Sequence, residues 1–529
     1  IEWIPQIMYN HHQAGPAGTV VAGPPYRDPY NYVFDPILMT SLDAVGAAMH
    51  NRMNVEAKPG YTQRGGSVFS TWYNGGLRTT TYFHNMIGLL TEIVGGPTPS
   101  EIPLVPARLL PNGDSPNPVL PQKWYFKNSI DYSVSLNYAV LNYAQRYRDE
   151  LLFNIYKMGK NSIERGGKDT WSFSPKKIDA INAAANADRT STTGGRGALS
   201  VKYLDTVMKN PVNRDARGYI LSADQPDFTT AIRFLNALIR TGVQVQKATS
   251  NFTVAGKNYP AGSYVVKTDQ AFRPHVLDMF EPQDHPNDFK YEGGPPVAPY
   301  DAAGWTLAYL MNVKFDRILD DFRGPFEKMP HGELLKATPK ALPKSTGYAL
   351  SAAANESFLA VNELLKGGAE VFRNQADGSF YVPASTKSTA ILDKAEHGFG
   401  MRVTAANKPS KLTKVAPARI AIWDTYGGSM PSGWLRFIME QYHFDAKVIY
   451  APDIDAGDLK SKYDVIVFVG GSIPAYVANP TENNNAGRQN FGTPALESIP
   501  EEYRARVGRV SQDKSIPEIK KFLEAGGQV

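Results

Sequence analysis

The sequence predicts an α/β protein that is built from several domains. Strand-like and helix-like runs alternate from Ile1 to about Pro97, an internal repeat follows near the middle, and three strand-like runs with intervening helix close the chain. The 529 residues are too many for one ordinary domain, because a single core rarely grows beyond about 250–300 residues. A hydrophobic content of 42% indicates a folded chain.

A pair of histidines closes the first strand-like run. The residues Ile7-Met8-Tyr9-Asn10 lead directly into His11 and His12. Imidazole is a common zinc ligand. Two adjacent histidines are equally typical of a surface loop, so the pair alone leaves both interpretations open.

A second apolar run, Gly88-Leu89-Leu90-Thr91-Glu92-Ile93, contains a carboxylate. A carboxylate inside such a strand is costly unless it is paired, hydrogen-bonded or directed into a cleft. Glu92 is therefore a candidate functional residue, and its presence favours the metal interpretation of the histidine pair.

The segment from His12 to Glu92 resembles the C-terminal half of a carboxypeptidase A-like zinc carboxypeptidase domain, as found in large bacterial members of that family. The stretches Gly23–Pro29 and Trp72–Leu77 fit the same members. The resemblance implies a mixed sheet with flanking helices. It also implies that His12 is the third zinc ligand and that Glu92 is the general base, with His11 the next candidate for the ligand.

The resemblance further implies a zinc-dependent metallocarboxypeptidase that hydrolyses C-terminal peptide bonds of a peptide or protein. Zinc would polarise the scissile carbonyl, and Glu92 would carry a proton from the attacking water to the leaving amine. Tyr73 is the candidate for a substrate-positioning tyrosine, and Tyr61 is the next. Arg78 lies either near the cleft or at the surface of a turn. The family implies a periplasmic or secreted location.

The sequence departs from the family pattern in one respect. The family takes two zinc ligands from an early His-x-x-Glu motif, and none of the 9 histidines here has a glutamate three residues later. We therefore expect the chain to be a fragment, cut inside a domain at both ends, that does not hold a catalytic zinc by itself. The activity would belong to the parent protein.

The chain divides into four expected domains, listed here by residue range: a carboxypeptidase-like domain over 1–185, accessory α/β units over 198–300 and 301–410, and a final domain over 417–529. A linker is expected over 178–197 because this stretch is rich in alanine and small polar residues. The two accessory units contain the repeat: Gly218–Ala223 is echoed by Gly347–Ala352, each followed by a helix-like run that ends near a glycine.

The sequence also predicts two helices and one polar cluster to which we assign no catalytic role. Residues 132–165 read as one long helix that packs over the first domain, and 43–53 as a helix that carries His50 on its solvated face. His275, Asp278, His285 and Asp288 could form a second metal cluster, but their Pro-rich setting favours hydrogen-bonded turns.

The final domain, with strands predicted at 419–424, 446–450 and 463–471, resembles a flavodoxin-like, class I glutamine amidotransferase-like layer. An active amidotransferase needs a cysteine nucleophile, and the chain contains no cysteine. Ser429 lies in Gly427-Gly428-Ser429-Met430-Pro431, which is not the Gly-x-Ser-x-Gly motif of serine hydrolases.

Composition excludes some classes of function. The net charge is +5, but lysine and arginine are scattered, so the basic stripe of a nucleic-acid-binding protein is missing. No apolar run is long enough to span a bilayer. The alternative to the peptidase is a non-catalytic envelope binding protein built on a peptidase-like body.

Overall fold

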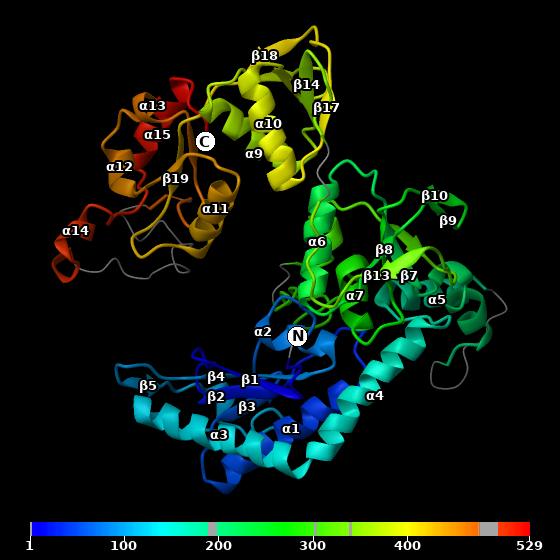
Figure 1. Cartoon of the computed structure of the whole chain (residues 1–529). Coiled ribbons are helices and arrows are strands. Elements are labelled where there is room, and N and C mark those ends of the chain that lie inside the picture. Colours follow the sequence, from blue (N-terminus) through cyan, green and yellow to red (C-terminus); the bar gives the residue numbers. More distant parts are fainter. Residues whose placement is uncertain (1–2, 189–197, 301–303, 338–340, 474, 477–495) are drawn as a thin grey trace. The chain divides into compact units, whose positions relative to one another are not determined.

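The computed structural model describes residues 3–188, 198–300, 304–337, 341–473, 475–476 and 496–529 (Figure 1). It is a mixed α/β protein with 37% helix and 18% strand in several sheets, some of them with parallel strands. The chain forms two compact units, Ile1–Leu335 and Lys336–Val529. In the part that the structure describes, no helix is both long and apolar enough to cross a membrane.

The first sheet carries the strands that the sequence pattern singled out. Its four strands are β1 (Ile7–His12), β2 (Val21–Tyr26), β3 (Tyr61–Arg64) and β4 (Ile87–Ile93), in the order β1-β4-β2-β3. β1 is parallel to β4, β4 is antiparallel to β2, and β2 is parallel to β3, so the sheet is mixed as expected. Every residue of β2 and β4 is buried.

Helices cover both faces of this sheet. α1 (Pro36–Val55) packs on β2 and begins with a proline after the cap residue Asp35, whose side chain accepts a hydrogen bond from the Ile37 N–H. α2 (Leu77–Thr80) contacts β1 and β4 from the other face (Figure 1). The predicted helix over 43–53 is thereby confirmed.

His50 lies on α1, but the prediction that it faces solvent is wrong. Its imidazole is 6% exposed, stacks on the ring of Tyr61 at 4.5 Å and contacts the side-chain oxygen of Gln63 through Nδ1. Burial is the main cause that lowers its pKa. Sequence spacing located the helix, but the aromatic partner comes from β3.

The long helix predicted over 132–165 is two helices, α3 (Phe126–Arg146) and α4 (Arg148–Gly166). The sequence predicts that a stripe of Tyr138, Leu141, Tyr143 and Tyr147 packs over the first domain. Tyr138 is 53%, Leu141 62% and Tyr147 45% exposed, whereas Tyr143 is partly buried and packs against the core. α3 packs against α1 instead with a different face, which includes Leu136. Residues 98–124, whose richness in proline and polar residues predicts a long surface loop, contain a ribbon of β5 (Ser100–Ile102) and β6 (Gln122–Trp124).

The expected linker over 178–197 is helical in its first part. α5 (Pro175–Ala187) starts with a proline after Ser174, which is a regular helix start. The remainder of the predicted linker, from residue 189, lies outside the described residues. A short π-helix, Leu204–Met208, follows before the repeat.

The two copies of the repeat form five-stranded sheets with the same strand order. The first sheet has the order β12-β7-β11-β8-β13 and the second β17-β14-β16-β15-β18. Neighbouring strands are antiparallel in both sheets. The two strands that flank the first helix of each copy are therefore not neighbours: β11 lies between β7 and β8, and β16 lies between β14 and β15. The first copy consists of β7 (Gly218–Leu221), α6 (Phe228–Arg240), β8 (Gln246–Ala248), β11 (Tyr264–Lys267), β12 (Asp316–Ile318) and β13 (Phe326–Lys328). The second consists of β14 (Gly347–Leu350), α9 (Asn355–Lys366), β15 (Phe372–Asn374), β16 (Phe380–Pro383), α10 (Thr386–Phe399), β17 (Val403–Ala405) and β18 (Leu412–Lys414).

The first copy carries elements that the second copy does not share. A hairpin of β9 (Phe252–Val254) and β10 (Lys257–Tyr259) precedes β11, and α7 (Arg273–Phe280) and α8 (Leu307–Leu310) lie between β11 and β12. α7 corrects the loop predicted around His275. All eight of its residues are buried, so the sequence lacks the polar face by which a surface helix is recognised.

The final segment forms a three-stranded parallel sheet, as predicted. Its order is β20-β19-β21, with β19 (Ile420–Trp423) paired to both β20 (Ala446–Ile449) and β21 (Val465–Val467). The surrounding helices are α11 (Met430–Gln441), α12 (Ala451–Asp455), α13 (Leu459–Lys462), α14 (Glu501–Arg504) and α15 (Ser515–Glu524).

Candidate active site at the ends of β1 and β4

The structure brings His12 and Glu92 together. They are register partners on the parallel strands β1 and β4, and each lies at or near the carboxyl end of its strand. Nδ1 of His12 is 3.2 Å from Oε1 of Glu92. Parallel pairing is what places side chains from these two distant segments beside each other at one end of the sheet.

The two side chains differ in their access to water. The His12 side chain is 50% exposed, whereas that of Glu92 is 6% exposed. Within the part of the chain that the structure describes, Oε2 of Glu92 is buried and has no hydrogen-bond partner. A buried carboxylate oxygen without a partner is unusual, and it makes Glu92 the residue of this pair whose bonding capacity is not satisfied among the described residues.

His11 is held by neighbours. Its Nδ1 is 3.3 Å from Oγ1 of Thr91, its Nε2 is 3.2 Å from Nδ2 of Asn137 on α3, and its ring contacts Tyr9. Burial is the main cause that lowers the pKa of His11. Among the described residues, the Nε2 of His12 contacts only the local side chain of Asn10, at 3.0 Å. Of the adjacent histidines, His12 is therefore the better candidate for contact with a ligand.

Tyr73 and Tyr61 occupy different surroundings. Tyr73 lies in the loop between β3 and α2, and its neighbours Trp72 and Asn74 bond to Gln283 and Asp278. Tyr61 is 1% exposed and donates its hydroxyl hydrogen to the carbonyl oxygen of Pro24 at 2.8 Å. Tyr61 is therefore part of the core and cannot position a substrate from this conformation.

Arg78 is buried, so the prediction that places it at the surface of a turn is wrong. It is 3% exposed, its guanidinium lies 4.1 Å from the centre of the Tyr26 ring, and it donates to the carbonyl oxygen of Ser70 at 2.6 Å. Such a cation–π contact in a desolvated site stabilises the fold. No sequence pattern indicates this role, because the aromatic ring comes from the distant strand β2.

The residues that the structure describes do not complete a zinc centre. No group of three or more histidine, cysteine, aspartate or glutamate side chains within these ranges is arranged to hold a metal ion. A structural or catalytic zinc site needs at least three protein ligands, and only His12, with Glu92 beside it, is present here. His275, Asp278, His285 and Asp288, for which the sequence favours hydrogen-bonded turns over a metal cluster, do not gather into a metal-binding group in the described part of the chain: Asp278 binds amide groups, and Asp288 pairs with Arg27 at 2.6 Å.

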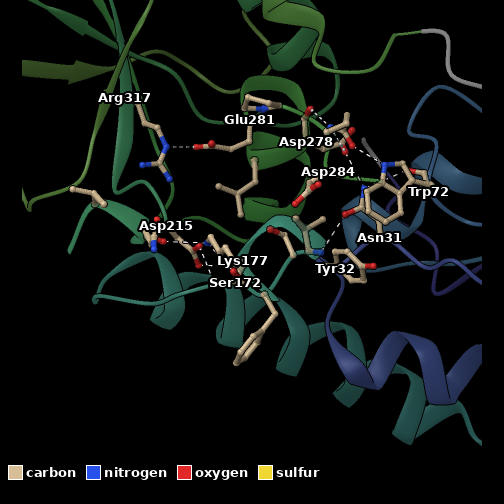
Figure 2. A pocket seen from close by; sticks show the side chains of 18 residues that line it. Asn31, Tyr32, Trp72, Ser172, Lys177, Asp215, Asp278, Glu281, Asp284 and Arg317 are labelled. Carbon is tan, nitrogen blue, oxygen red and sulfur yellow. Dashed lines mark hydrogen bonds and ion pairs between the residues drawn. The ribbon is translucent and has the colours of Figure 1, made fainter. Parts of the chain in front are cut away.

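A second site, which sequence reasoning did not identify, is a cavity of about 260 Å³. It lies between the Asn31–Val33 loop, the start of α5 and the end of α7 (Figure 2). Its charged lining residues are Lys177, Asp215, Asp278, Glu281, Asp284 and Arg317.

Asp278 is the most deeply buried acid at this cavity. Its side chain accepts hydrogen bonds from Asn31 and Gln283, both at 3.1 Å, and from Asn74. Burial raises the pKa of Asp278 to about 6, although the three amide donors act in the opposite direction. The cluster joins α7 to the loop that contains Tyr73.

Comparisons of the chain with protein-family models, with curated proteins and with solved structures found no match.

Proposed function

We propose that the chain carries the His12–Glu92 part of a zinc-dependent metallocarboxypeptidase centre, with Glu92 as the general base. The observation that supports this proposal is the 3.2 Å contact between Nδ1 of His12 and Oε1 of Glu92 at the ends of two parallel strands. The remaining metal donors would have to come from outside the described residues. A zinc ion, when bound, would act as the Lewis acid on the scissile carbonyl.

The role of Glu92 follows from its surroundings. Its carboxylate is almost enclosed, and one oxygen has no hydrogen-bond partner among the described residues. An oxygen of this kind can accept a proton from a water molecule and later deliver it to the leaving amine. His12, which is half exposed, would orient Glu92 in the absence of a ligand and would turn its ring towards a ligand when one is bound. The proposed substrate is the C-terminus of a peptide or protein in the periplasm or outside the cell.

The test uses protein expressed from the complete reading frame. N-acetylated peptides with free C-termini are incubated with the wild type, Glu92→Gln and Glu101→Gln, and released amino acid is quantified together with bound zinc. Glu101 is an exposed glutamate on β5 and is the matched control. Glu92→Gln should lower turnover by about 10²–10⁴-fold with unchanged zinc content, whereas Glu101→Gln should behave as the wild type. Turnover by Glu92→Gln at the wild-type rate would remove Glu92 from this role.

His12 is tested by metal content. His12→Ala should lower the zinc bound per chain, and His397→Ala, which changes an exposed histidine of the second unit, should not. Unchanged zinc in His12→Ala would assign the ligand elsewhere.

The second candidate function is a non-catalytic binding protein with a peptidase-like body. It is favoured by the incomplete donor set among the described residues. Protein from the complete reading frame that binds no zinc and releases no amino acid would support this candidate over the peptidase.

A further inference from the structure

Some of the charged side chains that line the cavity beside α5 and α7 form ion pairs within the protein, and others do not. Glu281 accepts a hydrogen bond from Nε of Arg317 at 2.7 Å, and Asp215 pairs with the buried Arg273 at 3.0 Å. These two acids are therefore neutralised within the protein. Lys177, Asp278 and Asp284 are the lining charges that are not in such pairs among the described residues, and Asp278 is already bound by three amide groups.

The ammonium group of Lys177 has one N–H donor that forms no hydrogen bond among the described residues. Its ammonium donates to the carbonyl oxygens of Ser172 at 2.7 Å and Asn213 at 3.1 Å. An ammonium has three N–H donors, so one remains for a ligand. Burial lowers the pKa of Lys177, and the positive charge of Arg317 adds to this effect, while Asp215, Glu281 and Asp284 oppose it. An anionic group bound between Lys177 and Arg317 would relieve their repulsion.

Asp284 supplies the opposite charge. Its Oδ2 accepts a hydrogen bond from the main-chain N–H of Lys176 at 3.0 Å, at the start of α5, and Oδ1 has no partner among the described residues. The negative charge of Asp284 contributes to raising the pKa of Tyr32, after burial, and it also acts on Lys177. Asp284 is thus within electrostatic reach of both side chains. Figure 2 shows Lys177, Asp284 and Tyr32 around the same space.

Aromatic side chains complete the lining. Tyr32 is 43% exposed and Phe173 is 54% exposed, and both border the cavity together with Trp72. The ring of Tyr32 meets that of Trp72 edge to face at 5.1 Å. Exposed aromatic faces at a cavity with a few placed charges are the usual composition of a small-molecule site.

We propose that this cavity binds a free α-amino acid with an apolar or aromatic side chain. Its carboxylate contacts Lys177, its ammonium contacts Asp284, and its side chain packs against Tyr32 and Phe173. The volume of about 260 Å³ lies just below the range of drug-sized sites, about 300–1,000 Å³, and so suits a ligand of this size better than a peptide. The proposal is independent of the His12–Glu92 centre, because it concerns binding and requires no turnover.

Isothermal titration calorimetry of the full chain tests the proposal. The probes are L-phenylalanine, 3-phenylpropionate, which lacks the ammonium, and phenethylamine, which lacks the carboxylate. The wild type should bind L-phenylalanine, and each analogue should bind at least about tenfold more weakly, because a lost charged hydrogen bond has an effect of this size. No binding of L-phenylalanine at about 10 mM, or equal binding of either analogue, would overturn the proposal.

Three variants locate the site. Lys177→Gln and Asp284→Asn should each weaken L-phenylalanine binding at least about tenfold. Lys176→Gln removes an exposed lysine next to Lys177 and keeps the main-chain N–H that binds Asp284, so it should bind as the wild type does. Circular dichroism verifies that each variant folds. If Lys177→Gln does not fold, Asp284→Asn decides, and wild-type affinity in that variant would overturn the proposal.

Discussion

Asp278 gives the molecule a pH-dependent stability that can be measured with one substitution. The side chain is 4% exposed, lies on α7 and accepts hydrogen bonds from Asn31, Asn74 and Gln283. Asp278→Asn keeps the shape of the side chain and removes its ionisable carboxyl group. Asn74 can rotate its amide to accept from the new amide group, since its oxygen forms no hydrogen bond among the described contacts, so the fold should tolerate this change.

The magnitude follows from the pKa difference between the folded and unfolded chain. Asp278 has a pKa of about 6 when folded and 3.8 as its ordinary value. A difference of about 2 pKa units corresponds to about 3 kcal/mol. Between these pH values Asp278 is more fully protonated in the folded protein than in the unfolded chain, so its contribution to stability falls as the pH rises. The contribution is fully present below about pH 4 and is lost above about pH 6.

The assay compares the free energy of unfolding of the wild type and Asp278→Asn by urea titration at a series of pH values. Tryptophan fluorescence is a suitable probe, because the indole N–H of Trp72 donates to Gln283 in the same cluster. The wild-type free energy minus that of Asp278→Asn should fall by about 3 kcal/mol from about pH 4 to about pH 7. Asp269→Asn, at an exposed position before α7, should give no such trend. A flat or rising difference for Asp278→Asn would refute the reasoning.

Two further predictions concern packing and buried histidines. A Cβ at Gly46 on α1 would lie 2.6 Å from the carbonyl carbon of Pro24, whereas one at Gly159 on α4 would be 3.5 Å from its nearest neighbour. Gly46→Ala should therefore destabilise the first unit by about 1–3 kcal/mol, while Gly159→Ala should stabilise it by up to about 1 kcal/mol. Urea titrations in which both substitutions change the free energy of unfolding in the same direction would contradict this. His275 has both ring nitrogens buried without a partner among the described residues and lies 4.5 Å from the ring of His84. Burial lowers the pKa of both, so these two histidines should contribute a loss of stability as the pH falls below about 6.5, opposite in sign to the contribution of Asp278. The thermal midpoint of the wild type minus that of His275→Leu should therefore fall between about pH 7.5 and about pH 5.5, and an unchanged difference would count against the buried-histidine effect.

Local patterns in the sequence predicted the repeat and the final parallel sheet. The echo of Gly218–Ala223 in Gly347–Ala352 gave two copies, and their sheets share one strand order. Such features depend on residues close together in the chain, which is why they are legible in the sequence. The antiparallel pairing within each copy could not be predicted, because it depends on a later strand, β11 or β16, that inserts between the two strands flanking the helix.

The candidate site was predicted in part, and the cavity was not. The pairing of His12 with Glu92 needs strands from distant segments in one register, which the sequence alone does not specify. Lys177 directly precedes the stretch that composition predicts to be a linker, and no pattern in the sequence marks it as a site residue, although Ser174 and Pro175 give a regular helix start. No sequence pattern singles out Asp284, and its relation to Lys177 arises only because the segment after α7 contacts the start of α5.

The difference between the two repeat copies explains where the cavity arises. In the second copy, α10 alone connects β16 to β17, whereas residues 268–315 connect β11 to β12 in the first copy. That longer connection supplies Asp278, which is bound by Asn31 and Asn74, and Asp288, which pairs with Arg27 at 2.6 Å. These contacts tie the first copy to the body that holds His12 and Glu92. The cavity is a consequence of this attachment, because it opens between the attached α7 end and α5. A ligand bound there would therefore add to the same contacts that hold the loop of Trp72 and Tyr73 against α7.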